Sequence, residues 1–314
     1  MPGTGIAADA TVTKHDLGLG HPEQPARYSA ILNRLEARGL VHEVERLASR
    51  SATDDEVALV HSRDYIALVE REVAIGRRQL STGDTDVCSD SVIAARSAAG
   101  CVLAAVDAVF SGPVANAFCV VRPPGQHASA RRGMGFCLFN NIAIGARYAQ
   151  TAFNAERVLI ADWDVHHGNG TQDIFYAAGS VLFFSTHQSP WYPGTGDASE
   201  TGEGAGAGLT INCPFPAGSG RAEILGAFRK QLLPAARSFR PDLIMISAGF
   251  DSRTGDPLGL FTLIDDDFHE LTVMMMDLAG ELCGGRVVSV LEGGYSLEGL
   301  ARASEAHVRA LLGH

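Results

Sequence analysis

The chain alternates short, continuous apolar runs with longer segments whose apolar residues recur at helical spacing. The apolar runs predict strands covered on both faces, at residues 117–121, 158–161, 181–186, 210–213, 243–247 and 287–291. Helical spacing predicts helices at 140–151, 220–238 and 265–282, and at 27–38, 63–75 and 91–109 in a mostly helical N-terminal third. Alternating strands and helices indicate a mainly parallel sheet flanked by helices on both faces. We therefore expect one three-layer α/β domain over residues 1–314, since no linker or internal repeat divides the chain.

Composition narrows the class of protein. The 314 residues are 46% hydrophobic and 19% charged, which is typical of a globular enzyme. A net charge of −11 disfavours nucleic-acid binding. The most apolar stretch, 101–110, contains Asp107 and is too short to span a bilayer, and residues 1–13 do not resemble a signal peptide. Six cysteines without a C-x-x-C pair indicate reduced thiols. We expect a cytoplasmic protein without nucleic-acid or membrane partners, and the oligomeric state stays open.

Polar residues directly after the predicted strand 158–161 indicate a metal site. Residues 162–170 read DWDVHHGNG. Residues two apart point to the same side of an extended segment, so Asp164 and His166 can bind one ion together. This oxygen and nitrogen pair suits a divalent transition metal, with zinc as the first expectation and Fe(II) or Co(II) as alternatives. The competing interpretation is an ordinary polar turn, which is disfavoured because unpaired polar groups next to a core are costly.

Three other predicted strands also end in polar residues. Residues 122–128 follow strand 117–121, residues 248–252 follow strand 243–247, and residues 292–295 follow strand 287–291. Ligands of such sheets bind beyond the carboxyl ends of the strands. The four loops together bring two carboxylates, two histidine positions and a tyrosine to one edge of the sheet.

These motifs together resemble the class II branch of the histone deacetylase superfamily, which shares its fold with arginase. The likeness covers the chain from about His15 to the C-terminus, and its motifs are residues 122–127 (RPPGQH), 135–141 (GFCLFNN), 162–172 (DWDVHHGNGTQ), 193–197 (PGTGD), 247–252 (SAGFDS) and 291–295 (LEGGY). The resemblance implies hydrolysis of the acetyl amide of acetyl-lysine by metal-activated water. It implies one zinc ion bound by Asp164, His166 and Asp251, with a fourth position left open as in catalytic zinc sites. The arginase-like alternative needs two metals, and neither motif offers the second carboxylate.

The resemblance also implies the catalytic roles. His127 would be the general base, held at its far ring nitrogen by Asn169, and Tyr295 would stabilise the oxyanion. The superfamily usually has two adjacent histidines where this chain has Gln126 and His127. We expect Gln126 to donate a hydrogen bond to Asp162, although it cannot carry a proton. Catalysis would then depend on His127 alone, and the alternative is an impaired centre that only binds acyl-lysine.

Substrate contacts follow from the same resemblance. Gly135, Phe136 and Tyr192 look like aromatic walls for an extended aliphatic chain, and Gly293 beside Tyr295 allows close backbone approach. Polyamine-selective relatives place an acidic gatekeeper where this chain has Leu258. Leu258 therefore favours acetylated lysine side chains over acetylpolyamines, and a polyamine or small-molecule amide hydrolase is the alternative.

Two further expectations concern buried ions and histidines. The resemblance implies a structural potassium ion held by Asp162, by the carbonyls of Asp164, His166 and Thr186, and by the Ser185 hydroxyl; the alternative is that these polar atoms only hydrogen-bond one another. Several other histidines have no ligand-like partner in the sequence, so we expect them at surface or capping positions: His15, His42, His61, His187, His269 and His307.

Overall fold

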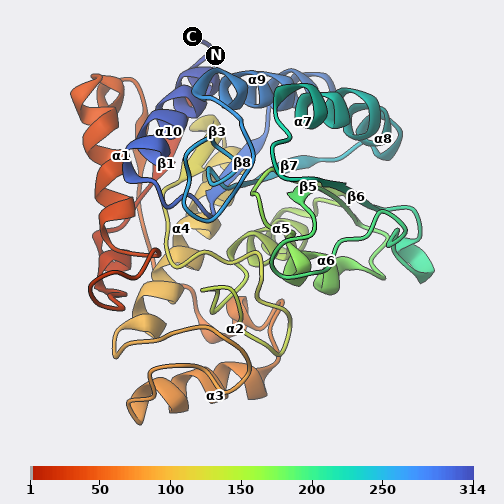
Figure 1. The fold of residues 1–314 in the computed structure, drawn as a ribbon. Helices are drawn as coiled ribbons and strands as arrows, with labels where there is room; N and C mark the ends of the chain where they lie inside the picture. Colours follow the sequence, from red (N-terminus) through yellow and green to blue (C-terminus); the bar gives the residue numbers. More distant parts are fainter. Residues whose placement is uncertain (1–2) are drawn as a thin grey trace.

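In the part of the chain that the structure describes, a single sheet of eight strands, all paired in parallel, forms the centre of the protein (Figure 1). The structure is a computed structural model that describes residues 3–314. The strand order is β2-β1-β3-β8-β7-β4-β5-β6. The strands are β1 (Gly3–Ala7), β2 (Glu45–Leu47), β3 (Val114–Cys119), β4 (Val158–Asp162), β5 (Val181–Gln188), β6 (Thr210–Phe215), β7 (Leu243–Ala248) and β8 (Val287–Leu291). The predicted three-layer α/β fold with a parallel sheet is confirmed.

The register of the central strands places their carboxyl ends level with one another. Asp162 at the end of β4 pairs with Ser247 of β7, which pairs with Val290 of β8. Val290 in turn pairs with Cys119 at the end of β3. Every residue of β4, β7 and β8 is buried, as the continuous apolar runs predict for strands covered on both faces. The loops that follow these strands therefore begin side by side.

Helices cover both faces of the sheet (Figure 1). One face carries α1 (Ala26–Ala37), α7 (Arg221–Ala227), α8 (Leu233–Phe239), α9 (Asp265–Leu282) and α10 (Leu297–Leu312). The other carries α4 (Ser91–Ser111), α5 (Asn141–Phe153) and α6 (Asn169–Phe175), with α2 (Asp54–Val57) and α3 (Arg63–Ala74) beyond them. Helix α4, which contains the stretch 101–110, is by length and composition apolar enough to cross a membrane, but 72% of its most apolar window is buried inside the protein.

Some elements differ from the sequence-based expectation. Strands β1 and β2 and helix α10 were not predicted, and the helix expected at 220–238 is divided into α7, a π-helical turn at Phe228–Leu232 and α8. Pro234 lies in the first turn of α8 and has no N–H to donate to a carbonyl in the preceding turn, which accounts for the irregular hydrogen bonding there. Helix α9 has the predicted bounds, from Asp265 to Leu282.

Candidate metal centre and active-site cavity

The candidate site is built by the loops that follow four adjacent strands. In the sheet order, β3, β8, β7 and β4 are neighbours. Their loops carry His127, Tyr295, Asp251 and the Asp164/His166 pair respectively. Residues that are far apart in sequence therefore meet at one edge of the sheet, as the four polar strand ends predict.

Asp164, His166 and Asp251 form a compact buried cluster. One potential ligand atom from each lies within 4.8 Å of the others. His166 Nδ1 lies 3.0 Å from Asp164 Oδ1 and 3.2 Å from Asp251 Oδ2. Two carboxylates and one imidazole, converging from two loops, are a ligand set suited to a divalent transition metal.

The surroundings of this cluster fit a metal ion. Asp251 Oδ1 accepts the Val165 N–H at 2.9 Å, and Asp164 Oδ2 accepts the Gly293 N–H at 2.8 Å, so both carboxylates are oriented by backbone donors. Asp251 Oδ2 is buried and has no hydrogen-bond partner within the described residues 3–314. A Cβ at Gly249 would lie 2.1 Å from Asp164 Oδ2, so the chain keeps space open around this carboxylate. An orphaned buried carboxylate oxygen in an oriented donor set favours a cation at this position.

Burial and the charges of the two carboxylates shift the pKa values of His166 and Asp251. Burial lowers the pKa of His166, but the hydrogen bond with Asp164 and the negative charges of Asp164 and Asp251 outweigh it and raise the pKa to about 10. Burial raises the pKa of Asp251, and the neighbouring Asp164 raises it further. A metal ion bound here would compete with protons for the same atoms.

His127 is held in one orientation beside the cluster. Its Nδ1 lies 2.8 Å from Asn169 Oδ1, so Nδ1–H donates to the amide oxygen and Nε2 is left with a free lone pair. Asn169 Nδ2 lies 3.4 Å from Met134 Sδ. Burial, together with the nearby His166, lowers the pKa of His127 to about 4. The imidazole is therefore neutral at pH 7 and can accept a proton.

Tyr295 is fixed mainly through its backbone. Asp256 accepts the N–H groups of Tyr295 at 2.7 Å and of Ser296 at 3.0 Å. The guanidinium carbon of Arg27 lies 4.9 Å from the centre of the Tyr295 ring. Burial raises the pKa of the Tyr295 hydroxyl well above its usual value, so this hydroxyl is a donor at all physiological pH values. Sequence reasoning did not identify the positions of Arg27 and Asp256 around Tyr295, because both come from distant segments.

The expected hydrogen bond between Gln126 and Asp162 is absent from the described residues 3–314. Gln126 Oε1 and Asp162 Oδ2 are both buried without a hydrogen-bond partner. The Gln126 N–H instead donates to Glu292 Oε2 at 3.1 Å, which also accepts the Gly125 N–H at 2.7 Å. The loop is thus anchored through its backbone to Glu292, and this anchoring does not depend on the Gln126 side chain. That prediction was wrong.

A cavity of about 320 Å³ leads to the cluster. Its walls are Asp84, His127, Gly135, Phe136, His166, Trp191, Tyr192, Leu258 and Tyr295. The structure therefore brings four of the five predicted substrate contacts together on the walls. Asp84 was missed by the sequence reasoning; its carboxylate accepts the Gly135 N–H at 2.9 Å and the Tyr192 hydroxyl at 3.0 Å. No sequence signal marks Asp84, since its partners lie far along the chain.

Two other expectations receive no independent support from the geometry. Gly293 lies against Asp164 and Asp251 and is not among the residues that line the cavity. The Ser185 hydroxyl, expected to bind potassium, lies 3.0 Å from His187 Nδ1 and is engaged in a hydrogen bond there. Asp162 and Thr186 are buried nearby, with Thr186 Oγ1 3.5 Å from the Asp162 carbonyl.

Four of the histidines expected at the surface are buried instead: His15, His61, His187 and His307. His307 is typical of them, since its ring nitrogens lie 2.7 Å from the hydroxyls of Thr272 and Ser289. Burial lowers the pKa of His307 to about 3 and those of the other three to about 4. The expectation failed because their partners are hydroxyls and backbone groups supplied by tertiary packing.

These features place the chain among α/β proteins with a candidate divalent-metal site at the carboxyl edge of a parallel sheet. Residues 21–311 match the family model described as histone deacetylase domain. The chain belongs to the histone deacetylase family, and the resemblance to its class II branch is confirmed.

Individual relatives are similar in sequence to this chain along nearly its whole length. Histone deacetylase 6 of Caenorhabditis elegans is 40% identical over 301 residues, covering 91% of this chain and 31% of that protein. The human protein named Polyamine deacetylase HDAC10 is 42% identical over 302 residues, covering 93% of this chain and 44% of that protein. The crystal structure of the HDA15 HD domain superposes with a TM-score of 0.95 at 38% identity, covering 100% of this chain and 90% of that one. The chain thus spans less than half the length of the two curated relatives.

Proposed function

We propose that this protein is a zinc-dependent deacetylase that hydrolyses the acetyl amide of acetyl-lysine side chains in proteins or peptides. One observation carries the proposal: the cavity is lined by His166 of the metal cluster together with His127 and Tyr295, and its other walls are largely apolar or aromatic. The neutral four-carbon stem of an acyl-lysine suits such walls while its amide reaches the polar end. Membership of the histone deacetylase family supports the same reaction.

The residues present supply each step of an amide hydrolysis. Asp164, His166 and Asp251 would hold the zinc ion, which when bound polarises the acetyl carbonyl and lowers the pKa of water. His127 takes the proton of the attacking water at Nε2, because its Nδ1 is engaged with Asn169. The Tyr295 hydroxyl donates to the carbonyl oxygen as negative charge develops there. When the C–N bond breaks, His127 passes its proton to the lysine nitrogen, and acetate leaves.

An acetylpolyamine is the second candidate substrate. The relative named Polyamine deacetylase is 42% identical to this chain, and the Asp84 carboxylate at the cavity wall can bind a second ammonium group. Leu258, an apolar residue of the same cavity wall, favours acetyl-lysine because it offers no charge to a second amine. A centre that binds acyl-lysine without hydrolysing it is the remaining alternative, motivated by Gln126.

The test compares acetate release from an acetyl-lysine peptide and from an N-acetylated polyamine, with and without added zinc. Zinc-dependent turnover of the peptide that is lost in Tyr295→Phe supports the proposal. Turnover of the polyamine alone would show that the substrate is an acetylpolyamine and not acetyl-lysine. Binding of the peptide without turnover would show that the centre binds acyl-lysine without hydrolysing it. Leu258→Glu is expected to shift the preference toward the polyamine.

We also propose that the protein works in a reducing, cytoplasmic environment. All six cysteines are free thiols, and five of them are buried. Alkylation of unfolded protein after rapid acid quenching of cells would detect six modified thiols if this is correct and fewer if disulfides form.

A further inference from the structure

Two buried arginines contact the segments that carry the proposed catalytic residues. Arg27 of α1 donates from Nε to the Gly294 carbonyl at 2.7 Å and from Nη2 to the Glu292 carbonyl at 2.5 Å, immediately before Tyr295. Arg122 begins the segment that leads to His127, and its Nη1 donates to the Val12 carbonyl at 2.7 Å. Each arginine thus ties one catalytic segment to the N-terminal part of the chain.

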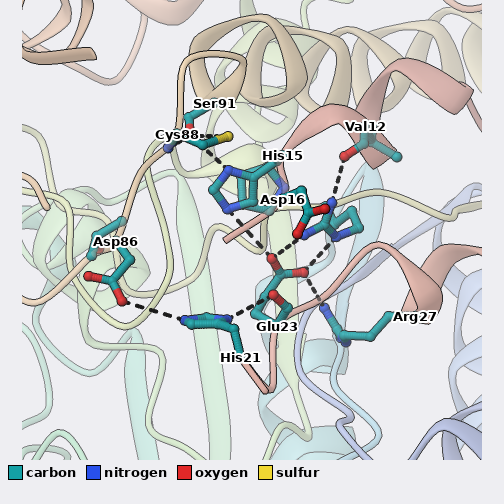
Figure 2. Close-up of polar contacts among 12 residues, drawn as sticks. Val12, His15, Asp16, His21, Glu23, Arg27, Asp86, Cys88 and Ser91 are labelled. Atoms are coloured by element: carbon teal, nitrogen blue, oxygen red, sulfur yellow. Dashed lines mark hydrogen bonds and ion pairs between the residues drawn. The ribbon is translucent and has the colours of Figure 1, made fainter. Parts of the chain in front are cut away.

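Glu23 is shared between these two arginines, and Figure 2 shows its contact with Arg27. Its Oε1 accepts Arg27 Nη1 at 3.2 Å and Arg122 Nε at 2.8 Å, and its Oε2 accepts Arg122 Nη2 at 2.5 Å. The side chains of all three residues are fully buried. In the described part of the chain, Glu23 is the one carboxylate that forms an ion pair with either arginine. Two guanidinium groups therefore depend on one carboxylate for charge compensation.

The position of Glu23 is itself constrained. His21 Nδ1 lies 2.8 Å from the Glu23 carbonyl, and the His21 ring packs edge-on against Phe136 of the cavity wall at 5.0 Å between ring centres. Figure 2 shows the His15 ring next to the Glu23 carboxylate, and its Nε2 lies 3.5 Å from Glu23 Oε2. His15 Nδ1 lies 2.8 Å from the Ser91 hydroxyl at the start of α4. His21 therefore fixes the Glu23 backbone, and His15 packs against the carboxylate without a hydrogen bond to it.

We infer that Glu23 is a positioning residue that, through Arg27 and Arg122, keeps the Tyr295 and His127 segments in register with each other. His127 and Tyr295 must act on the same acetyl amide group within a fraction of an ångström, so a shared anchor affects catalysis more than binding. This inference rests on the proposed deacetylase function only for its kinetic consequence. The structural consequence, ordering of two segments by one carboxylate, holds for any activity.

Two substitutions separate positioning from folding. Glu23→Gln removes the charge and leaves two buried guanidinium groups uncompensated, so this variant is at risk of not folding. Glu23→Asp keeps the charge but withdraws the carboxylate by about 1.5 Å, the length of one C–C bond, so that it no longer reaches both arginines. Glu305→Asp is the matched control, because Glu305 also joins arginines, Arg34 and Arg309, but lies on α10 away from the cavity.

The first readout is steady-state kinetics of the zinc-loaded protein on an acetyl-lysine peptide. We expect Glu23→Asp to lower kcat by about tenfold or more with KM within about twofold of wild type, and Glu23→Gln, if folded, to lower kcat further. Glu305→Asp should match wild type. A folded Glu23→Asp protein with wild-type kcat would overturn the inference.

The second readout is hydrogen exchange measured by mass spectrometry, which does not need activity. Glu23→Asp is expected to speed exchange in peptides covering 122–128 and 291–296, where the N–H groups of Gly125, Gln126 and Gly293 are hydrogen-bonded in the wild type. Unchanged exchange in both segments would overturn the inference. If the wild-type protein does not turn over any acyl-lysine peptide, the proposed function fails, and the exchange result still decides the role of Glu23.

Discussion

Gly293 lies so close to the candidate metal ligands that even one methyl group should disturb them. A Cβ at this position would lie 1.9 Å from Asp251 Oδ2 and 2.6 Å from Asp164 Oδ2. Gly293 is not among the residues with positive φ, so alanine is compatible with its backbone conformation. The effect of Gly293→Ala should therefore come from contact with the two carboxylates and not from backbone strain.

The size of the effect follows from these distances. To restore the 3.0 Å limit of real Cβ contacts, Asp251 Oδ2 must move by about 1.1 Å. Overpacking of this kind costs about 1–3 kcal/mol of folding free energy. Displaced ligands also bind metal less tightly, and disturbance of residues around a metal typically lowers affinity by about 10–100-fold. We expect zinc affinity to fall within that range, equivalent to about 1.4–2.7 kcal/mol.

The assay is competition for zinc between the protein and a chromophoric chelator, with thermal unfolding measured in parallel. Gly280→Ala is the matched control: Gly280 lies within α9, and its Cβ would meet no described atom within 4 Å. Alanine there should leave zinc affinity unchanged and stabilise the helix by about 0.5–1 kcal/mol. A folded Gly293→Ala protein that binds zinc as tightly as wild type would refute the proposed metal centre geometry.

Three other predictions follow from the site and the core. Tyr295→Phe should lower kcat by about 10²–10³-fold with little change in KM or unfolding temperature, and an unchanged kcat in steady-state assays would exclude the oxyanion role. Because the pKa of His166 is raised to about 10 without metal, zinc binding at pH 7.5 should release protons; calorimetry in buffers of different ionisation enthalpy would detect this, and no net release would contradict it. The four buried histidines have pKa values lowered from about 6.5 to about 3–4, so they stabilise the fold fully above pH 6.5 and lose that contribution as pH falls toward 4. Each contributes a slope of about 1.4 kcal/mol per pH unit in denaturant titrations between pH 6 and 5. Replacing His61 with Gln should reduce the slope by about that amount, and an unchanged slope would contradict this account.

The parts of the site that depend on local spacing could be predicted from the sequence. Asp164 and His166 are two residues apart at the end of a strand, and extended geometry alone puts their side chains on one side. The strands themselves are continuous apolar runs, so their carboxyl ends and the polar loops after them are visible in the sequence. The convergence of four loops then follows from the parallel sheet.

The parts that depend on long-range contacts could not be predicted in this way. Asp84 reaches the cavity through Gly135 and Tyr192, which lie 51 and 108 residues away. Gln126 is anchored by Glu292, 166 residues away, and its side chain does not meet Asp162. His307 was expected at the surface because its partners, Thr272 and Ser289, are brought to it only by packing of α10 onto α9 and the sheet.

The position of β8 in the sheet has a consequence for synthesis of the protein. It is the last strand along the chain, yet it lies between β3 and β7 in the middle of the sheet. While the chain is still emerging from the ribosome, β3 and β7 cannot pair with their central neighbour, so two apolar strand edges stay exposed until residues 287–291 have been made. Such long-range parallel pairing is slow and favours aggregation of incomplete chains. We therefore expect folding during translation to depend on chaperones, and we expect chains that end before β8 not to assemble the metal site.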